Sequence, residues 1–161
     1  PYVFTKHNRD FLHATLFLMT TFLLIFMWWV KWNFSSVQDW TYIKYFILLV
    51  DFGLMFMMCD AIAPSNSESI SSWSEHVQKV QNLFFILLFL KFFIGGIQNM
   101  YILQQDKRLL FGIGAILLCL PPAIALLTKN RMVIKFIPVC LTILFFSMGL
   151  ISVILTGGLV Q

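Results

Sequence analysis

Two oppositely charged residues stand near the middle of two long apolar stretches, and this feature constrains the fold more than any other. Asp51 lies within residues 42–63, and Lys91 lies within residues 81–103. A charge in the hydrocarbon core of a membrane costs about 2.5–3.5 kcal/mol unless it is paired or hydrated. Two antiparallel helices would hold both residues about 15 Å deep, so we expect an ion pair. Such a pair either fixes the register of the helices or relays a proton or an ion.

Apolar stretches of this kind make up most of the 161 residues, of which 60% are hydrophobic and 11% charged. There are five, at residues 11–32, 42–63, 81–103, 109–127 and 132–156, with a polar, serine-rich loop at 64–79. Each is close to the ~20 residues that a helix needs to cross a bilayer. A capping pattern from Ser72 to Glu75 starts the third helix near Trp73. The sequence therefore predicts an all-α, polytopic membrane protein, a single domain built as a bundle of five transmembrane helices.

Tryptophans gather where the first stretch ends and the second begins. Their positions are Trp28, Trp29, Trp32 and Trp40. Indole rings favour the headgroup level of a bilayer, so the group indicates a membrane interface; the alternative is an aromatic site for a ligand or a cation. Basic residues beside the stretches favour a cytoplasmic N-terminus, by six to four.

Several further residues are candidates for a pathway or a kink. They are Asp60, Gly95, Gly96, Asn99, Pro121 and Pro122. The two glycines offer either a close approach for another helix or room for water. The two prolines remove backbone donors, so we expect the fourth helix to kink or break there. Such a break is either a matter of shape or the lining of a substrate path.

Residue types that serve catalysis, metal binding or cofactor binding do not cluster in the sequence. Cys59, Cys119 and Cys140 are isolated, with no CxxC pair. His13 is the only histidine inside a stretch, whereas a haem-binding bundle usually offers two axial ligands. We therefore expect no metal, no cofactor and no enzymatic activity. The net charge of +4 includes no basic stripe with interleaved aromatics, so we expect no nucleic-acid partner either.

One pattern of motifs within residues 13–85 is similar to that of a known group of proteins. It combines Trp28-Trp29-x-x-Trp32, Asp39-Trp40-Thr41 and Glu75-His76-Val77. This resembles a set of uncharacterised small bacterial polytopic membrane proteins, which have a Trp-rich first span and an E-H segment before a later span. The group has a basic run where this chain has Gln78-Lys79-Val80-Gln81-Asn82. The resemblance implies the bacterial inner membrane as the location and implies no activity.

Two functions remain open at the level of the sequence. The first is a non-enzymatic membrane subunit, scaffold or sensor that works through helix contacts, with the lipid bilayer and other membrane subunits or further copies as partners. The second is an oligomeric ion or proton channel or carrier. It would use Asp51, Lys91 and the Pro121-Pro122 break as its pathway. A pore should carry polar residues in register along one helix face, and a subunit need not.

Overall fold

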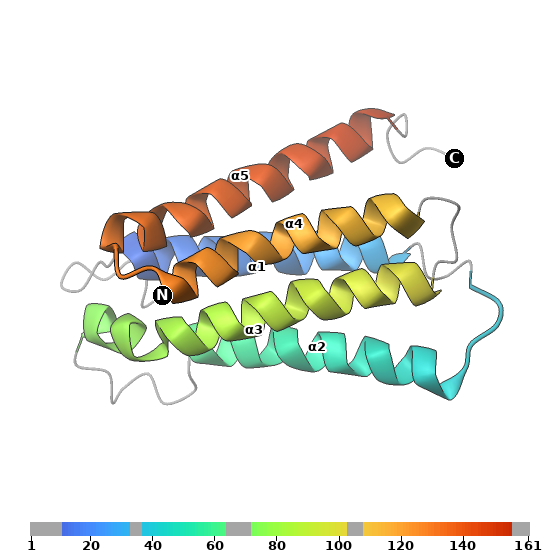
Figure 1. The fold of residues 1–161 in the computed structure, drawn as a ribbon, viewed down its shortest axis with the longest axis horizontal. Helices are drawn as coiled ribbons and strands as arrows, with labels where there is room; N and C mark the ends of the chain where they lie inside the picture. Colours follow the sequence, from blue (N-terminus) through green and yellow to red (C-terminus); the bar gives the residue numbers. More distant parts are fainter. Residues whose placement is uncertain (1–10, 33–36, 64–71, 103–107, 156–161) are drawn as a thin grey trace.

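The computed structural model describes residues 11–32, 37–63, 72–102 and 108–155, and these form five α-helices (Figure 1). The helices are α1 (Phe11–Trp32), α2 (Tyr42–Ile62), α3 (Trp73–Ile102), α4 (Arg108–Leu127) and α5 (Arg131–Leu155). Their ends lie within one residue of the predicted apolar stretches, except that α3 begins at Trp73, ahead of its apolar part. The prediction of an all-helical chain is therefore confirmed for the described residues.

Four of the helices are long and apolar enough to cross a membrane, namely α1, α2, α3 and α5. The described apolar part of α4, Ile113–Leu127, is shorter than a full span. Local signals fix two of the helix starts. The hydroxyl of Thr41 accepts a hydrogen bond from the Lys44 backbone N–H at the start of α2, and the side chain of Asn130 accepts one from the Met132 N–H at the start of α5.

The helix α3 lies at the centre of the packing, between α2 on one side and α4 on the other (Figure 1). The helix α1 packs mainly against α5, and both cover the remaining side of the core. Each outer helix uses a single stripe with helical spacing. In α1 the stripe includes Leu12, Leu16, Met19, Leu23 and Met27, all buried. The helix α3 contributes two fully buried rings, Phe84 and Phe85.

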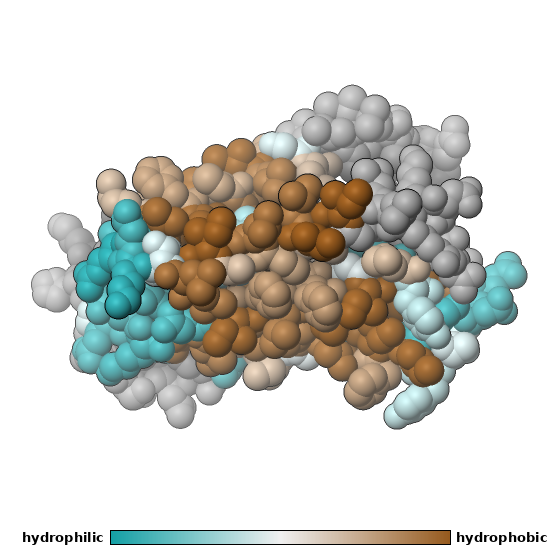
Figure 2. All heavy atoms as spheres, in the orientation of Figure 1, coloured by the Kyte–Doolittle hydropathy of each residue, from teal (hydrophilic) through white to brown (hydrophobic). Residues whose placement is uncertain are grey.

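The outer surface changes character along the long axis of the bundle. Figure 2 shows an apolar band around the middle and hydrophilic residues gathered toward both ends. Large apolar side chains exposed on the described helices include Leu49, Phe56, Ile116 and Phe136. A soluble monomer rarely exposes so large a continuous apolar surface, whereas a bilayer covers one at no cost. The exterior thus has the pattern of a helix bundle that is surrounded by lipid.

Of the kink or break expected at Pro121 and Pro122, the break does not occur, because α4 runs as one helix through both residues to Leu127, and the kink stays a prediction. The prolines still remove the donors for the carbonyls of Leu117 and Leu118. They lie within the last two turns of the helix, where Pro122 is buried in the core. Helices with internal prolines persist where neighbouring elements support them, and the burial of Pro122 places it among such neighbours.

Candidate functional site

The predicted partners Asp51 and Lys91 meet between α2 and α3, where the Lys91 ammonium donates a hydrogen bond to Oδ1 of Asp51. Both residues are buried, with exposed fractions of 0% for Asp51 and 8% for Lys91. The contact joins residues that are 40 positions apart in the chain. Burial of a charge in a medium of low dielectric is favourable only when the opposite charge and hydrogen bonds compensate for lost water. The pair therefore ties the two helices together at one fixed register.

Two further polar residues are buried in α2 and α3, one heptad from the pair. Lys44 precedes Asp51 by seven residues, and Gln98 follows Lys91 by seven, so each lies on the same helix face as its neighbour. Because α2 and α3 run antiparallel, both steps lead toward the same end of the bundle (Figure 1). The Lys44 ammonium donates to the Asp39 carbonyl at 2.7 Å, beyond the start of α2. We call these four residues the polar line; Lys44 and Gln98 lie about two helical turns from the charge pair, toward this end.

The opposite side of the pair is apolar. One and two turns further along α2 lie Met55 and Met58, and the preceding turns of α3 hold Leu88, Phe85 and Phe84. All five side chains are almost completely buried. Among the described residues, the polar line therefore stops at the pair and does not continue through the core. A route for ions along α2 and α3 would have to cross this apolar layer.

The two central glycines of α3 have different surroundings. A Cβ on Gly96 would collide with the Cβ of Ala115, so this glycine allows α3 and α4 to approach closely. A Cβ on Gly95 would meet nothing within 4 Å. Of the two roles that the sequence left open, Gly96 has the packing role. The neighbouring Asn99 is half-buried and follows the buried Gln98.

The remaining predicted residues do not join the pair. Asp60 is exposed near the end of α2, and the nearby Lys79 forms an ion pair with Glu75 at 2.8 Å. Trp28 is exposed, and Trp40 packs on Tyr45 with ring centroids 4.7 Å apart. The side chains of Trp29 and Trp32 lie outside the described residues. Trp28 and Trp40 stand at one end of the apolar band, as residues at an interface would.

Two histidines have a role that the sequence did not reveal, because both bind the last turn of α2. His13 of α1 lies with Nε2 3.0 Å from the Ile62 carbonyl oxygen, and His76 of α3 lies with Nε2 2.9 Å from that of Ala61. A carbonyl oxygen can only accept, so each Nε2 donates. The His13 ring also packs on Trp73, with centroids 4.3 Å apart. The histidines therefore satisfy carbonyls that a helix end leaves without partners.

Among the described residues, no three His, Cys, Asp or Glu side chains come together in the way that a metal site requires. Cys59, Cys119 and Cys140 are free thiols. The site thus offers one enclosed ion pair with a polar line on one side. Comparison of the chain with known families, curated proteins and solved structures gives no match. The resemblance to small bacterial membrane proteins therefore stays a prediction.

Proposed function

We propose that the protein is an integral membrane protein of five spans, resident in a bacterial inner membrane with its N-terminus in the cytoplasm. The apolar band and the four long apolar helices support the membrane location. The fifth span would be α4, whose described apolar part of Ile113–Leu127 is extended by Leu109, Leu110 and Phe111 in the sequence. The bacterial location follows from the resemblance of the motifs alone.

Cysteine labelling in intact cells tests this orientation. In a variant without native cysteines, an impermeant maleimide should label Gln38→Cys, which follows α1, and should not label Ser69→Cys, which follows α2. Both should react after the membrane is made permeable, which controls for reactivity. Labelling of Ser69→Cys alone in intact cells would reverse the orientation. Labelling of both in intact cells would contradict the span between them.

Within the membrane we propose a non-enzymatic role, as a subunit or scaffold that acts through helix contacts with other membrane proteins or with further copies. One observation carries this proposal. The charged residues at the middle of the described bundle, Asp51 and Lys91, are closed off inside it, while the surface at that level is apolar. The outward face of α2 presents large apolar side chains such as Leu49 and Phe56, which are open to contact with lipid or with another membrane protein.

Photo-crosslinking from the helix surfaces tests this role. A benzophenone amino acid at Phe56 or Leu49 of α2, and at equivalent exposed positions of α4 and α5, should yield a protein adduct of one defined mass in native membranes. The same amino acid at Ala61, which is half-buried at the His76 contact, serves as an inward-facing control. Adducts with lipid only, at every exposed position, would refute the proposal.

The buried polar line favours a second candidate function, a proton or ion carrier. Lys44 and Gln98 lie between the charge pair and one end of the bundle, as the polar residues of a half-channel from one side of the membrane would. The apolar layer of Met55, Leu88 and Phe85 would then have to open during transport. Proton flux into vesicles that contain the purified protein tests this candidate. The carrier predicts a flux that Asp51→Asn abolishes and Lys79→Gln preserves, and a flux no greater than that of empty vesicles would exclude it.

A further inference from the structure

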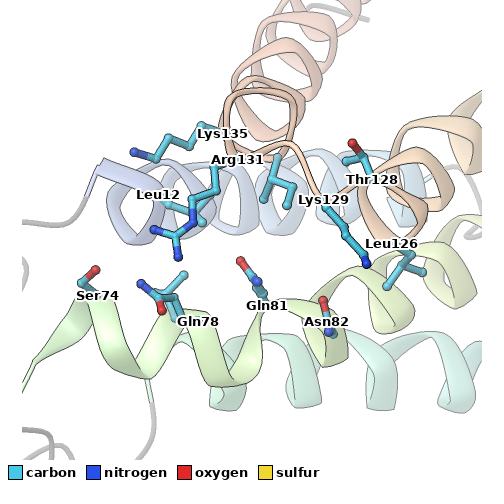
Figure 3. Close-up of a pocket in the computed structure, with 12 residues that line it drawn as sticks. Leu12, Ser74, Gln78, Gln81, Asn82, Leu126, Thr128, Lys129, Arg131 and Lys135 are labelled. Atoms are coloured by element: carbon cyan, nitrogen blue, oxygen red, sulfur yellow. The ribbon is translucent and has the colours of Figure 1, made fainter.

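A cavity of about 480 Å³ opens at the end of the bundle where α3 begins and the chain turns from α4 into α5 (Figure 3). Three basic residues line it, Lys129, Arg131 and Lys135. The described residues that line the cavity include no acidic side chain, and no described carboxylate forms an ion pair with these three. The cavity therefore concentrates positive charge, which attracts an anion.

The polar side chains on the two walls of the cavity face one another. Figure 3 shows that Arg131 and Lys129 extend from the turn toward α3, and that Gln81 and Asn82 extend from α3 toward them. The amides offer N–H donors, and the two cations offer charged donors. The start of α5 lies at the same wall, and the positive end of its dipole adds to the attraction. This arrangement suits a phosphate group, which carries several acceptor oxygens.

The turn that carries these cations is held in place by its own hydrogen bonds. The Thr128 hydroxyl accepts from the Asn130 N–H at 3.1 Å, and the Asn130 side chain accepts from the Met132 N–H at 3.0 Å. The two bonds fix the backbone at Asn130, which lies between Lys129 and Arg131 in the sequence. A fixed turn loses less conformational freedom when a ligand binds, so the site is organised in advance of binding.

Four apolar side chains also line the cavity beside its polar residues, and they help to identify the ligand. Leu12, Val77, Leu126 and Ile134 line the same cavity as the cations. The start of α3 and the α4–α5 turn lie at one end of the bundle (Figure 1), and Figure 2 shows hydrophilic residues gathered at that end beside the apolar band. A free phosphate ion would gain no favourable contact from apolar walls. A phospholipid would place its phosphate among the cations and its first acyl carbons along the apolar residues, at the depth where headgroups lie.

We propose that this cavity binds the phosphate headgroup of an anionic phospholipid. The proposal rests on the proposed membrane location of the protein, and it is independent of whether the protein acts as a subunit or as a carrier. A zwitterionic lipid offers the same phosphate but adds a cationic group, which the three basic residues repel. The cavity should therefore prefer phosphatidylglycerol to phosphatidylcholine.

Binding of short-chain lipids to the purified full chain in a neutral detergent tests the proposal. Thermal melting, followed by tryptophan fluorescence, should show saturable stabilisation by dioctanoyl phosphatidylglycerol and much less by dioctanoyl phosphatidylcholine. The double variant Lys129→Gln and Arg131→Gln should weaken the apparent affinity for phosphatidylglycerol by at least about tenfold, because charge-assisted hydrogen bonds are lost. The variant Lys79→Gln removes a cation near the start of α3 that does not line the cavity, and it should leave the affinity for phosphatidylglycerol unchanged.

A second variant keeps the test decisive if the double variant does not fold. Ser74→Phe would fill the cavity from the α3 wall without changing any charge, and should also weaken binding of phosphatidylglycerol. Equal stabilisation by both lipids, or equal affinity in Lys79→Gln and the cavity variants, would overturn the site. Equal stabilisation by inorganic phosphate and by phosphatidylglycerol would assign the cavity to a free anion and overturn the lipid. None of these results depends on a crosslinked protein or on a proton flux, so this proposal fails separately from the proposed function.

Discussion

Removal of one partner from the Asp51–Lys91 pair should destabilise the protein far more than removal of both. Each single change removes the opposite charge from a residue that stays buried, at exposed fractions of 0% for Asp51 and 8% for Lys91. Breaking such a pair typically costs about 3–5 kcal/mol, whereas a well-packed neutral replacement of both partners is often nearly neutral. For a chain of this length, a single change should lower Tm by about 6–20 °C.

The two single changes should not be equal. Lys91→Met leaves the Asp51 carboxylate, which has a short side chain and cannot move its charge to water. Asp51→Asn leaves the Lys91 ammonium on a four-carbon stem, which can bend toward a more polar region, such as the level of Gln98. We therefore expect Lys91→Met to be the more destabilising single change, and the double variant to recover more than half of its loss.

Thermal melting in a mild detergent measures the four proteins of this double-mutant cycle. The exposed pair of Glu75 and Lys79 provides a matched control, because it is also a Lys–carboxylate ion pair but is open to solvent. Glu75→Gln and Lys79→Met should each change stability by only about 0–1 kcal/mol. If the losses from Asp51→Asn and Lys91→Met simply add in the double variant, the two residues are not coupled and the reasoning is wrong.

Two further predictions concern helix packing and the end of α2. Gly96→Ala should destabilise the protein by about 1–3 kcal/mol through its clash with Ala115. Gly95→Ala should be neutral or slightly stabilising, since it adds a helix former in open space. In thermal melting, Ala115→Gly should restore the stability that Gly96→Ala loses, and no such rescue would show that the clash is elsewhere. His13→Phe should lower the free energy of unfolding by about 1–3 kcal/mol because it leaves the Ile62 carbonyl without this buried donor. His76 is half-buried, so His76→Phe should lower it less. Equal losses of unfolding free energy in denaturant titrations would contradict this difference in burial.

The parts of the fold that the sequence predicted well depend on long, local patterns. The apolar stretches determine the helices, and the depth of Asp51 and Lys91 within two antiparallel stretches was enough to place them together. The seven-residue step from Lys44 to Asp51 was a further signal in the sequence. Combined with the step from Lys91 to Gln98, it is enough to indicate a buried polar line between two antiparallel helices.

The parts that the sequence did not predict depend on which surfaces meet. His13 and His76 bind backbone carbonyls. Every residue has a backbone carbonyl, so the sequence does not show which of them accepts a hydrogen bond from a side chain. Gly95 and Gly96 are chemically identical, and only the position of α4 separates their roles. The cavity at the α4–α5 turn is lined by residues of four helices, so the sequence alone indicated only that its cations flank apolar stretches.

The contact between Asp51 and Lys91 also has a consequence for biosynthesis. During translation α2 leaves the ribosome first, with a charge at its middle whose partner is 40 residues behind. Alone in a bilayer, this helix would carry a penalty of about 2.5–3.5 kcal/mol, and α3 would carry a similar one. Insertion of α2 and α3 together as one hairpin, with the pair already formed, avoids both penalties. We therefore expect the ion pair to favour insertion of α2 together with α3, because the partner of Asp51 is present only after α3 has been made.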